Sequence, residues 1–397
     1  MKLKLRSIIA AALSAVFCMA AAGCSDSVPD GSGMENSGAV TAEAQAGEPD
    51  EFDTDITALE LTSNIRIGWN LGNTLDANGG QGLYQEQSWG NPKTTPELIQ
   101  AVKDAGFNAI RIPTTWEKQM DENNVINEEW FARVQEIVDY AYDLDMYVIL
   151  NMHHEEWCQP YPDKEAEIAE KLSASWTQIA ERFKDYDEHL IFEGMNEPRW
   201  KNTAFEWNGG NDEGRQVVNR LNKAFVDTVR ATGGNNQYRF LMVCPYAANS
   251  SESALSALEI PDDDRLIVSV HAYIPYSFAL QIPGSDKWLA TKPNCTREID
   301  ELAEVLDRLF ISKGQAVIIG ECGAMNRNNE EYRAQWAEYY FGKFREIGVP
   351  CFWWDNGAFT SGETFGLFDR YANTVRYPVL LEAMMKGASG EHSAEAA

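Results

Sequence analysis

Short apolar runs recur along the chain from residue 65 onward and alternate with longer, more polar segments. Each run is continuously apolar, which is typical of parallel strands that are buried on both faces. Eight strands are expected, at residues 65–70, 107–113, 146–151, 189–195, 238–244, 265–270, 315–320 and 350–355.

Helical patterns fill most of the segments between these runs. The first of them has Thr95 as a capping residue, Pro96 in the first turn and Gly106 at its end. Apolar residues at helical spacing begin again near residues 130, 168, 218, 299 and 332. The segment after the fifth strand is the weak unit, because the string SESALSAL is short for a full helix.

Eight strand–helix units favour an α/β fold built as a single (β/α)8 barrel, the TIM barrel. A doubly wound open sheet is the alternative. That fold normally has a Gly-rich phosphate turn after its first strand, and the string WNLGNTLDANGG does not match G-x-G-x-x-G. We therefore expect one barrel domain over residues 56–387.

The N-terminus has the pattern of a secretory signal. The basic string MKLKLR precedes an apolar run over residues 8–22, which is short for a membrane-spanning helix. The string AAGC resembles a bacterial lipoprotein box with Cys24 as the lipidated residue, and ordinary signal cleavage is the alternative. We expect residues 1–24 to be a signal peptide of the lipoprotein type. The protein would then be extracellular or at the cell surface, with membrane contact only through an anchor at Cys24.

Residues 25–55 are rich in Ser, Gly, Ala, Glu and Asp and contain almost no large apolar residues. We expect them to form a disordered acidic tether, and residues 388–397 a disordered tail. The cysteines beyond Cys24 are odd in number and lack zinc-type spacing, so we expect them to be mostly free, with a disulfide between two of them left open. They are Cys158, Cys244, Cys295, Cys322 and Cys351.

The formal net charge of −28 and the sequence pI of about 4.5 argue against nucleic acid or an anionic membrane surface as a partner. The 12 Trp, 15 Tyr and 17 Phe are enough for a large core and for a binding cleft. We expect a monomer that needs no cofactor.

Polar residues concentrate at the C-terminal ends of the expected strands, where the active site of a barrel lies. A single glutamate there is usually an exposed rim residue or a helix cap. Glu197 and Glu321 both follow apolar runs, however, and three of the five His of the chain lie at neighbouring strand ends. The candidate site residues are Asn70, Arg111, His153, His154, Asn196, Glu197, His271, Tyr273, Glu321 and Trp354.

Other roles are open to some of these residues. His153 and His154 could indicate a metal site, but adjacent side chains on a strand diverge and leave no compact ligand set, so no metal is expected. Arg111 could only brace the barrel, with Glu321 as a suitable partner. Trp354 could belong to the core, but the Asp-Asn-Gly string after it leads into a loop. Further loop tryptophans indicate stacking faces for sugar rings, and they are Trp89, Trp157, Trp200 and Trp207.

Two carboxyl groups at one barrel mouth fit retaining glycoside hydrolysis, in which an acid protonates the leaving oxygen and a carboxylate acts as nucleophile. Arg111 and the Tyr273 hydroxyl would keep Glu321 ionised, whereas Glu197 would be kept protonated. The amide of Asn196 could hydrogen-bond the sugar 2-hydroxyl.

At these residues the sequence resembles glycoside hydrolase family 5, the bacterial endoglucanase group of clan A, and most closely its subfamily 4. The resemblance runs from about residue 59 to residue 385 and rests on the strings IGWNLGNTLDA, WGNP, GFNAIRIPTTW, YVILNMHHE, LIFEGMNEPR, VSVHAYIPY, VIIGECG and FWWDNG. It implies a (β/α)8 barrel and a retaining mechanism, with Glu197 as acid/base and Glu321 as nucleophile. The supporting positions of the family fall on Arg111, His153, His154, Asn196, His271, Tyr273 and Trp354, and Asn70 is carried over as a glycone-side contact.

The resemblance also implies an endo-acting enzyme on β-1,4-glucan backbones, namely cellulose-type glucans, mixed-linkage β-glucan and xyloglucan. An endo-β-1,4-xylanase or a mannanase on the same barrel is the alternative, because loop shape decides between such substrates. A sugar-binding lipoprotein is the alternative outside the enzymes, but it does not explain the paired glutamates. A single anchored barrel favours soluble or hydrated glucans over crystalline cellulose.

Overall fold

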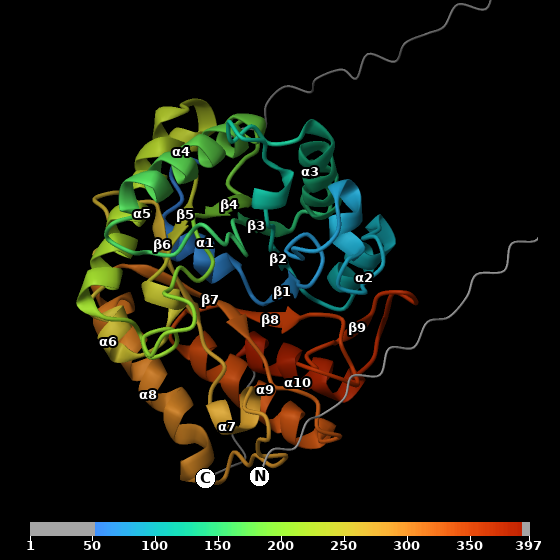
Figure 1. The fold of residues 1–397 in the computed structure, drawn as a ribbon. Coiled ribbons are helices and arrows are strands. Elements are labelled where there is room, and N and C mark those ends of the chain that lie inside the picture. The colour runs from blue at the N-terminus through green and yellow to red at the C-terminus, as the bar shows by residue number, and fades with distance from the viewer. Residues whose placement is uncertain (1–51, 391–397) are drawn as a thin grey trace, which may run out of the picture. The chain divides into compact units, whose positions relative to one another are not determined.

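The computed structural model describes residues 52–390, and within this range eight parallel strands form a closed barrel (Figure 1). Each strand pairs with the next in sequence, and β8 pairs with β1. The expected single (β/α)8 TIM barrel is confirmed, with every strand within a few residues of its expected position. The strands are β1 (Gly68–Leu71), β2 (Ala109–Ile112), β3 (Tyr147–Asn151), β4 (Leu190–Glu193), β5 (Leu241–Val243), β6 (Leu266–His271), β7 (Ala316–Cys322) and β8 (Cys351–Asp355), with a separate antiparallel pair of β9 (Phe368–Asp369) and β10 (Thr374–Val375).

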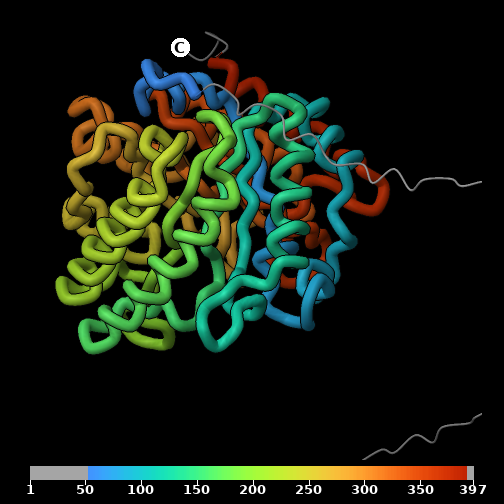
Figure 2. Tube along the Cα trace, turned by 90° about the horizontal axis from the view of Figure 1, so that it is seen from above, coloured from blue at the N-terminus to red at the C-terminus, as the bar shows by residue number. Residues whose placement is uncertain are grey.

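Helices surround the barrel on its outer side (Figures 1 and 2). The Thr95 hydroxyl accepts a hydrogen bond from the Leu98 amide at 3.4 Å, and Pro96 lies in the first turn, so α2 begins as expected. The unit after β5 is indeed weak, since its helix α6 has four residues. The helices are α1 (Ala58–Asn64), α2 (Pro96–Asp104), α3 (Glu128–Tyr142), α4 (Glu165–Arg182), α5 (Asp212–Ala231), α6 (Glu252–Leu255), α7 (Tyr276–Ala279), α8 (Pro293–Leu309), α9 (Glu330–Glu346) and α10 (Pro378–Ser389), with 3-10 turns η1 (Gly82–Gln87), η2 (Glu117–Gln119), η3 (Gly234–Gln237), η4 (Tyr246–Ala248) and η5 (Ile311–Lys313).

Two layers of apolar side chains form the core. The larger layer lies between the strands and the surrounding helices, and the smaller one fills the barrel itself. At Gly68 a Cβ atom would lie 2.0 Å from Phe352 Cδ1, so glycine leaves the room that this aromatic ring needs. The barrel layer contains Ala109, Ile149, Ile191, Met242, Ile267, Ala316, Ile318 and Phe352.

The first described residues close the N-terminal end of the barrel. Phe52 is 7% exposed, and its ring centroid lies 6.5 Å from that of Phe240, just before β5. The Arg265 guanidinium donates to the carbonyl oxygens of Thr54 and Ile56. The expected boundary between tether and barrel at residue 55 is therefore wrong, because Phe52 already belongs to the core.

The C-terminal boundary also lies further along the chain than expected. Helix α10 continues to Ser389 and is followed by Gly390 with a left-handed φ of 74°, so the barrel domain extends past residue 387. In Figure 2 the first described residues, in blue, and the last, in red, lie at the same end of the molecule.

The expected signal peptide at residues 1–24 lies outside the described residues, as do most of the expected tether and tail. Within residues 52–390 no helix has the length and apolar character to cross a membrane. The cysteines there are free, as expected, and they are Cys158, Cys244, Cys295, Cys322 and Cys351.

Candidate active site

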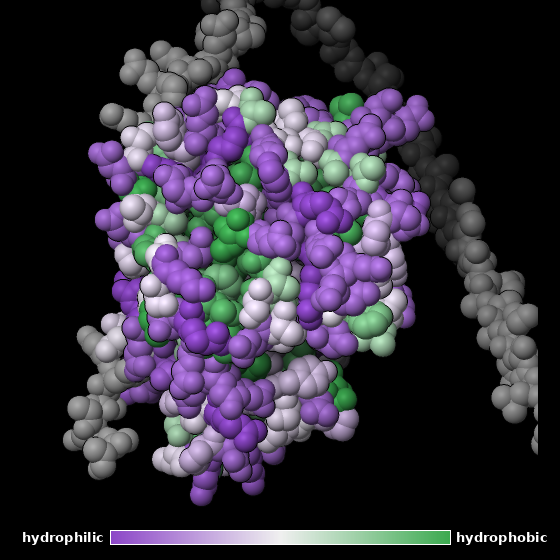
Figure 3. Space-filling model, turned by 90° about the vertical axis from the view of Figure 1, so that its left-hand side faces the viewer, coloured by the Kyte–Doolittle hydropathy of each residue, from purple (hydrophilic) through white to green (hydrophobic). Residues whose placement is uncertain are grey.

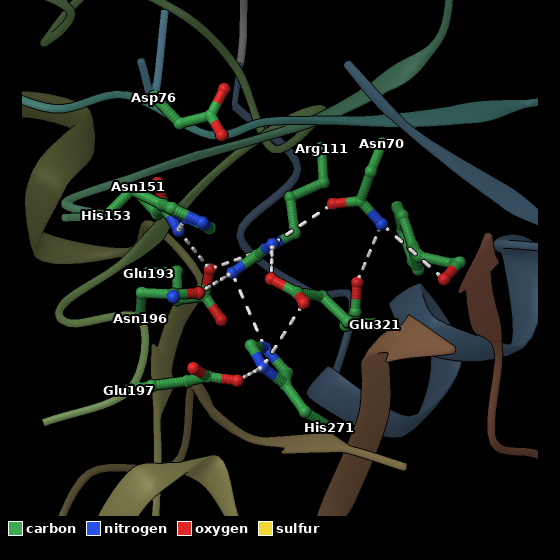
Figure 4. A network of polar contacts seen from close by, with 12 residues as sticks. Asn70, Asp76, Arg111, Asn151, His153, Glu193, Asn196, Glu197, His271 and Glu321 are labelled. Carbon is green, nitrogen blue, oxygen red and sulfur yellow. Dashed lines mark hydrogen bonds and ion pairs between the residues drawn. The ribbon is translucent and has the colours of Figure 1, made fainter. Parts of the chain in front are cut away.

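The polar side chains expected at the strand ends converge at the C-terminal mouth of the barrel (Figure 4). Strands β1, β2, β6, β7 and β8 carry some of them directly, and the others lie in the loops after β3, β4 and β6. Hydrogen bonds, ion pairs and ring contacts connect all of the expected residues into one group, which consists of Asn70, Arg111, His153, His154, Asn196, Glu197, His271, Tyr273, Glu321 and Trp354.

Arg111 on β2 lies at the centre of this group and is fully buried. Its Nε donates to Glu193 Oε2 at 2.7 Å and its Nη1 to Glu321 Oε1 at 2.7 Å. Nη2 donates to Asn196 Oδ1 at 2.6 Å, and Nη1 also donates to Asn70 Oδ1 at 3.0 Å. Burial lowers the pKa of Arg111, but Glu193 and Glu321 outweigh burial and raise this pKa above its ordinary value. Arg111 is therefore a fixed positive charge, and its expected pairing with Glu321 is confirmed.

Glu321 on β7 is 5% exposed and is contacted by residues of β2, of β6 and of the loop after β6. Besides the bond from Arg111, its Oε2 accepts a hydrogen bond from the Tyr273 hydroxyl at 2.9 Å and lies 3.6 Å from His271 Nδ1. Burial raises the pKa of Tyr273 well above its ordinary value, so the hydroxyl keeps its proton and acts as a donor. The carboxylate of Glu321 is thus fixed in one orientation at the mouth.

Glu197 lies in the loop beyond β4. That strand ends at Glu193, so the expected strand over residues 189–195 is too long at its C-terminus. The backbone amide of Asn196 donates to the Met152 carbonyl at 2.9 Å, and this bond connects the loop to the residue after β3. Glu197 Oε1 lies 2.8 Å from His271 Nδ1. The loop, rather than the strand, therefore places the carboxyl group of Glu197.

The carboxyl groups of Glu197 and Glu321 both approach the Nδ1 atom of His271, at 2.8 Å and 3.6 Å. One oxygen of each and a ring nitrogen of His271 all lie within 4.8 Å of one another. Retaining glycosidases have their two carboxyl groups about 5–5.5 Å apart, and inverting ones about 6.5–9.5 Å apart to admit a water. The nearest oxygens here are thus closer together than the spacing of the inverting class.

Glu197 and His271 shift each other's pKa across their 2.8 Å contact. Burial raises the pKa of the Glu197 carboxyl, but the hydrogen bond from His271 and the charge of Arg199 outweigh burial and lower this pKa below its ordinary value. Burial lowers the pKa of His271, but Glu321 and Glu197 raise it above its ordinary value. The direction of the Glu197 shift runs against the expectation that this carboxyl group is kept protonated in the free protein, because the contact with His271 favours the carboxylate.

His153, His154 and Trp354 form one wall of the mouth. The rings of His153 and Trp354 are parallel within 2°, with centroids 5.7 Å apart. Burial lowers the pKa of His153 well below its ordinary value and lowers the pKa of His154 to about 4. Both imidazoles are therefore neutral at neutral pH, and a neutral imidazole can donate to one sugar hydroxyl and accept from another.

The two asparagines differ in what they offer to a ligand. Asn70 is fully buried, with its Nδ2 donating to the Gly320 carbonyl at 2.9 Å and its Oδ1 accepting from Arg111. Burial and these two bonds argue against the expected glycone-side contact at Asn70, because both of its polar atoms already hold the protein together. Asn196 uses its Oδ1 for Arg111, whereas its Nδ2 has no partner within residues 52–390. This nitrogen can donate to a sugar hydroxyl.

A third carboxylate, Glu193, belongs to the site and is absent from the sequence-based candidates. It is fully buried at the end of β4, and its Oε2 accepts from Arg111 and from Asn151 Nδ2 at 3.0 Å. Its Oε1 accepts from the Ser269 hydroxyl at 2.5 Å. A carboxylate inside the apolar run HLIFEGM is a sign of a buried ion pair, and this signal could have identified Glu193.

Three groups of side chains within the described residues have the spacing of metal ligands. Two lie at the mouth, namely Glu197 with His271 and Glu321, and Asp76 with His153 and His154, and the third, Asp187 with Glu188 and His189, precedes β4. In the first group Arg111 already supplies a positive charge to Glu321, at 2.7 Å. Both carboxylate oxygens of Asp76 accept backbone amide hydrogens. The hydrogen-bond donors present thus satisfy the carboxylates of both groups at the mouth.

The expected loop tryptophans differ in their exposure. Trp207 is 56% exposed and Trp89 is 40% exposed, with the ring of Trp89 5.5 Å from that of His154. The ring of Trp200 is stacked on Tyr161 at 4.7 Å and serves packing. Trp157 lines a hollow beside Glu197, whose other walls include His153, His154, Asn196, Arg199 and Lys201. Three of the four tryptophans therefore have faces or edges available to a ligand.

A separate open groove lies between α6 and α8. Its lining includes Ile274, Leu302, Val305 and Arg308 and contains no Trp, Tyr or Phe. On one side of the molecule, shown in Figure 3, apolar residues gather in a central hollow and hydrophilic residues surround them. Because the groove offers no aromatic face for a sugar ring, the mouth of the barrel is the better candidate for a carbohydrate site.

A family model described as Cellulase (glycosyl hydrolase family 5) matches residues 73–360 of this chain. The match includes Glu193, Glu197 and Glu321 and strands β2 to β8. The chain belongs to glycosyl hydrolase family 5.

Family 5 endoglucanases are similar to this chain over most of its length. Endoglucanase A of Ruminococcus albus is 47% identical over 341 residues, which cover 84% of this chain and 93% of the relative. The structure of a GH5-4 broad specificity endoglucanase from Ruminococcus champanellensis with bound cellotriose is 46% identical with a TM-score of 0.81, covering 84% of this chain and 99% of that one. The structure of XEG5A, a GH5 xyloglucan-specific endo-beta-1,4-glucanase from a metagenomic library in complex with cellotriose, is 45% identical with a TM-score of 0.80, covering 83% and 98%.

As a member of family 5, the chain is a glycoside hydrolase of the cellulase group. The expected family is confirmed, and the similarity to structures described as GH5-4 endoglucanases supports the expected subfamily.

Proposed function

We propose that this family 5 enzyme is a retaining endo-β-1,4-glucanase, with Glu321 as nucleophile and Glu197 as acid/base. The observation that carries the proposal is the approach of the two carboxyl groups within 4.8 Å, each with different partners. Arg111 and Tyr273 hold Glu321, and His271 holds Glu197. These different partners support the proposal that Glu321 attacks and that Glu197 receives and delivers a proton.

In the first step a Glu321 oxygen attacks the anomeric carbon, and the bond between that carbon and the glycosidic oxygen breaks. The leaving oxygen takes the proton that His271 and Glu197 share across 2.8 Å. Attack converts Glu321 into a neutral ester, so the His271 imidazolium loses the negative charge that stabilised it most. Nucleophilic attack therefore drives the proton from His271 through Glu197 to the leaving group.

In the second step a water replaces the leaving sugar. The Glu197 carboxylate takes a proton from this water, and the water oxygen attacks the anomeric carbon. The ester bond to Glu321 breaks, which returns its carboxylate to Arg111. Two inversions give net retention, and the free Nδ2 of Asn196 is placed to donate to the sugar 2-hydroxyl in both transition states.

We propose β-1,4-glucan backbones as substrates, namely cellulose-type glucan, mixed-linkage β-glucan and xyloglucan. Support comes from one similar structure described as a broad specificity endoglucanase and another described as xyloglucan-specific, both with bound cellotriose. A panel of soluble polysaccharides with product analysis tests the proposal. We expect glucans to give a higher kcat/KM than xylan or mannan, and the reverse order would favour the xylanase or mannanase alternative.

Hydrolysis itself is tested at the two glutamates. Glu321→Ala should abolish the release of reducing ends from carboxymethyl-cellulose and leave binding intact. Glu197→Ala should slow substrates with poor leaving groups most, and added azide should restore part of the rate because it replaces the base-activated water. Hydrolysis that survives Glu321→Ala contradicts the assignment. A wild-type protein that binds glucan without cleaving it would favour the sugar-binding lipoprotein.

We propose further that the enzyme is exported and held at the cell surface through a lipid on Cys24. The string AAGC supports this proposal. Labelled palmitate should be incorporated into the wild type and not into Cys24→Ser. Equal incorporation into both would contradict the proposal.

A further inference from the structure

Arg199 lies two residues after Glu197 and contacts it twice. Its Nη1 donates to the Glu197 carbonyl at 2.9 Å and lies 3.3 Å from Glu197 Oε2. Both side chains are 15% exposed, so water screens this pair only in part. The two oxygens of the carboxylate thus have different cationic partners, with His271 at Oε1 and Arg199 at Oε2.

The guanidinium of Arg199 is fixed from its other sides. Its central carbon lies 4.0 Å from the ring centroid of Trp207, within the range of a cation–π contact. Its Nε donates to Glu206 Oε1 at 3.3 Å. Glu206 Oε2 accepts a hydrogen bond from the backbone amide of Asn202 at 2.8 Å. An arginine that is stacked and hydrogen-bonded in this way has a defined orientation. The exposed Trp207 ring therefore lies next to a charge that acts on the carboxylate of Glu197.

We propose that Arg199 is a positioning residue for the Glu197 carboxylate, that its charge favours the ionised form of this group, and that Trp207 holds the guanidinium in place. The proposal rests on the acid/base role proposed above for Glu197. Without Arg199 the carboxylate keeps its bond to His271 but loses the partner that fixes its second oxygen. Its orientation toward the leaving oxygen is then less defined, and the pair with His271 binds its proton more tightly.

Other ionisable groups also face Glu197. They come from β6, β7 and the loops after β3, β6 and β8, and they are His271, Glu321, His154, Tyr273 and Glu363. Arg199 contributes a positive charge from the loop of Glu197 itself, in contact with the carboxylate. Its removal therefore changes the charge at Glu197 without altering the groups on the neighbouring elements.

The test is the pH dependence of kcat/KM for an aryl β-cellobioside, measured on the full-length protein. In Arg199→Met most of the side-chain stem is kept and the charge is lost. The basic limb of the kcat/KM profile, where activity falls as the pH rises, should therefore shift to higher pH by about one unit. The kcat for mixed-linkage glucan, whose leaving group needs the acid, should fall on the order of tenfold. Arg199→Lys should keep most of the limb position, and Trp207→Ala should move the limb in the same direction by less.

Arg215→Met is the matched control. Arg215 lies in the first turn of α5, and its side-chain partners are Gly209, whose carbonyl accepts at 2.7 Å, Ser253 and Asp212, and not Glu197. The basic limb of the pH profile of Arg215→Met should stay at the wild-type position. If Arg199→Met lowers the melting temperature and leaves the limb in place, Arg199 only braces the loop and the inference is overturned.

A second variant separates this inference from the proposed function. Glu197→Ala should remove the basic limb altogether. If the limb persists in Glu197→Ala, the acid/base assignment itself is wrong. If the limb is lost in Glu197→Ala but does not move in Arg199→Met, only the role of Arg199 is wrong.

Discussion

Arg111 separates two buried carboxylates at the mouth that would otherwise repel each other. It pairs with Glu193 and Glu321 at 2.7 Å each, and the side chains of Arg111 and Glu193 are fully buried. Removing one member of a buried ion pair leaves an uncompensated charge, which costs more than the pair itself contributes. Arg111 therefore supports both the fold and the orientation of Glu321.

Replacement of Arg111 by Met should lower the free energy of unfolding by about 3–5 kcal/mol. It should also reduce kcat/KM on the order of 100-fold or more, because Glu321 loses the donor that orients it. Urea unfolding and initial rates measure the two effects. Arg220→Met is the control, since Arg220 forms an exposed pair with Glu165 that is worth about 1 kcal/mol or less. Equal effects of the two substitutions would contradict the role of Arg111.

The pair of His271 and Glu197 determines the basic limb of the pH profile. The pKa of His271 is raised and that of Glu197 is lowered, so the last proton of the pair is lost above the ordinary pKa of imidazole. In His271→Ala this proton resides on the carboxyl group alone, and the basic limb of kcat/KM should move to lower pH. The measurement is a pH series on an aryl β-cellobioside, and a limb that stays at the wild-type pH would show that the two groups do not share a proton.

At the scale of single residues, the sequence predicted which residues meet at the mouth better than it predicted the hydrogen bonds between them. Glu197, Glu321, His271 and Tyr273 could be located because polar residues after apolar runs collect at one end of a barrel. The direction of the Asn70 amide and the direction of the Glu197 pKa shift depend on neighbours that are distant in sequence, and no local pattern contains them.

Strand β1 depends on a glycine to pair closely with β8. Gly68 lies opposite Phe352 in the β1–β8 register, and a Cβ at this position would overlap the Phe352 ring. β1 and β8 therefore pack closely at this position because β8 carries a large side chain there and β1 carries none.

Gly68→Ala should lower the free energy of unfolding by about 2–3 kcal/mol, because the added methyl group overpacks the barrel interior. Phe352→Leu in the Gly68→Ala background should recover part of this loss. Thermal and urea unfolding of the single and double variants provide the test. Independent, additive effects would show that the two positions do not contact each other as described.

At the scale of elements, the continuous apolar runs predicted all eight strands but not where each one ends. β4 stops at Glu193, where its partner β3 also ends at Asn151. The apolar run continues to Met195 because that residue packs into the core outside the strand. Burial and strand pairing thus end at different residues, and sequence reports only burial.

At the scale of the whole molecule, the chain reaches the barrel at the end opposite the active site. Phe52 and α1 pack against the residues that fill the barrel interior. A lone phenylalanine in an acidic segment has no periodicity, which is why the expected tether extended too far.

Phe52→Ala should lower the free energy of unfolding by about 2–4 kcal/mol and leave kcat/KM on soluble β-glucan within about twofold of the wild type. The reason is that Phe52 belongs to the barrel core and touches no residue of the mouth. Val379→Ala, at a position that is 52% exposed, is the control and should change stability little. A large loss of activity at unchanged stability would contradict the separation of the two ends.

The central claim is that Glu321 forms a covalent bond to the sugar while Glu197 handles the proton. The most direct test is to incubate the enzyme with an activated 2-deoxy-2-fluoro-cellobioside and to locate the trapped sugar by peptide mass spectrometry. The account predicts one added cellobiosyl group, on the peptide and residue of Glu321. A label on Glu197 or Glu193, or no label from an enzyme that inverts the anomeric configuration of its product, would contradict it.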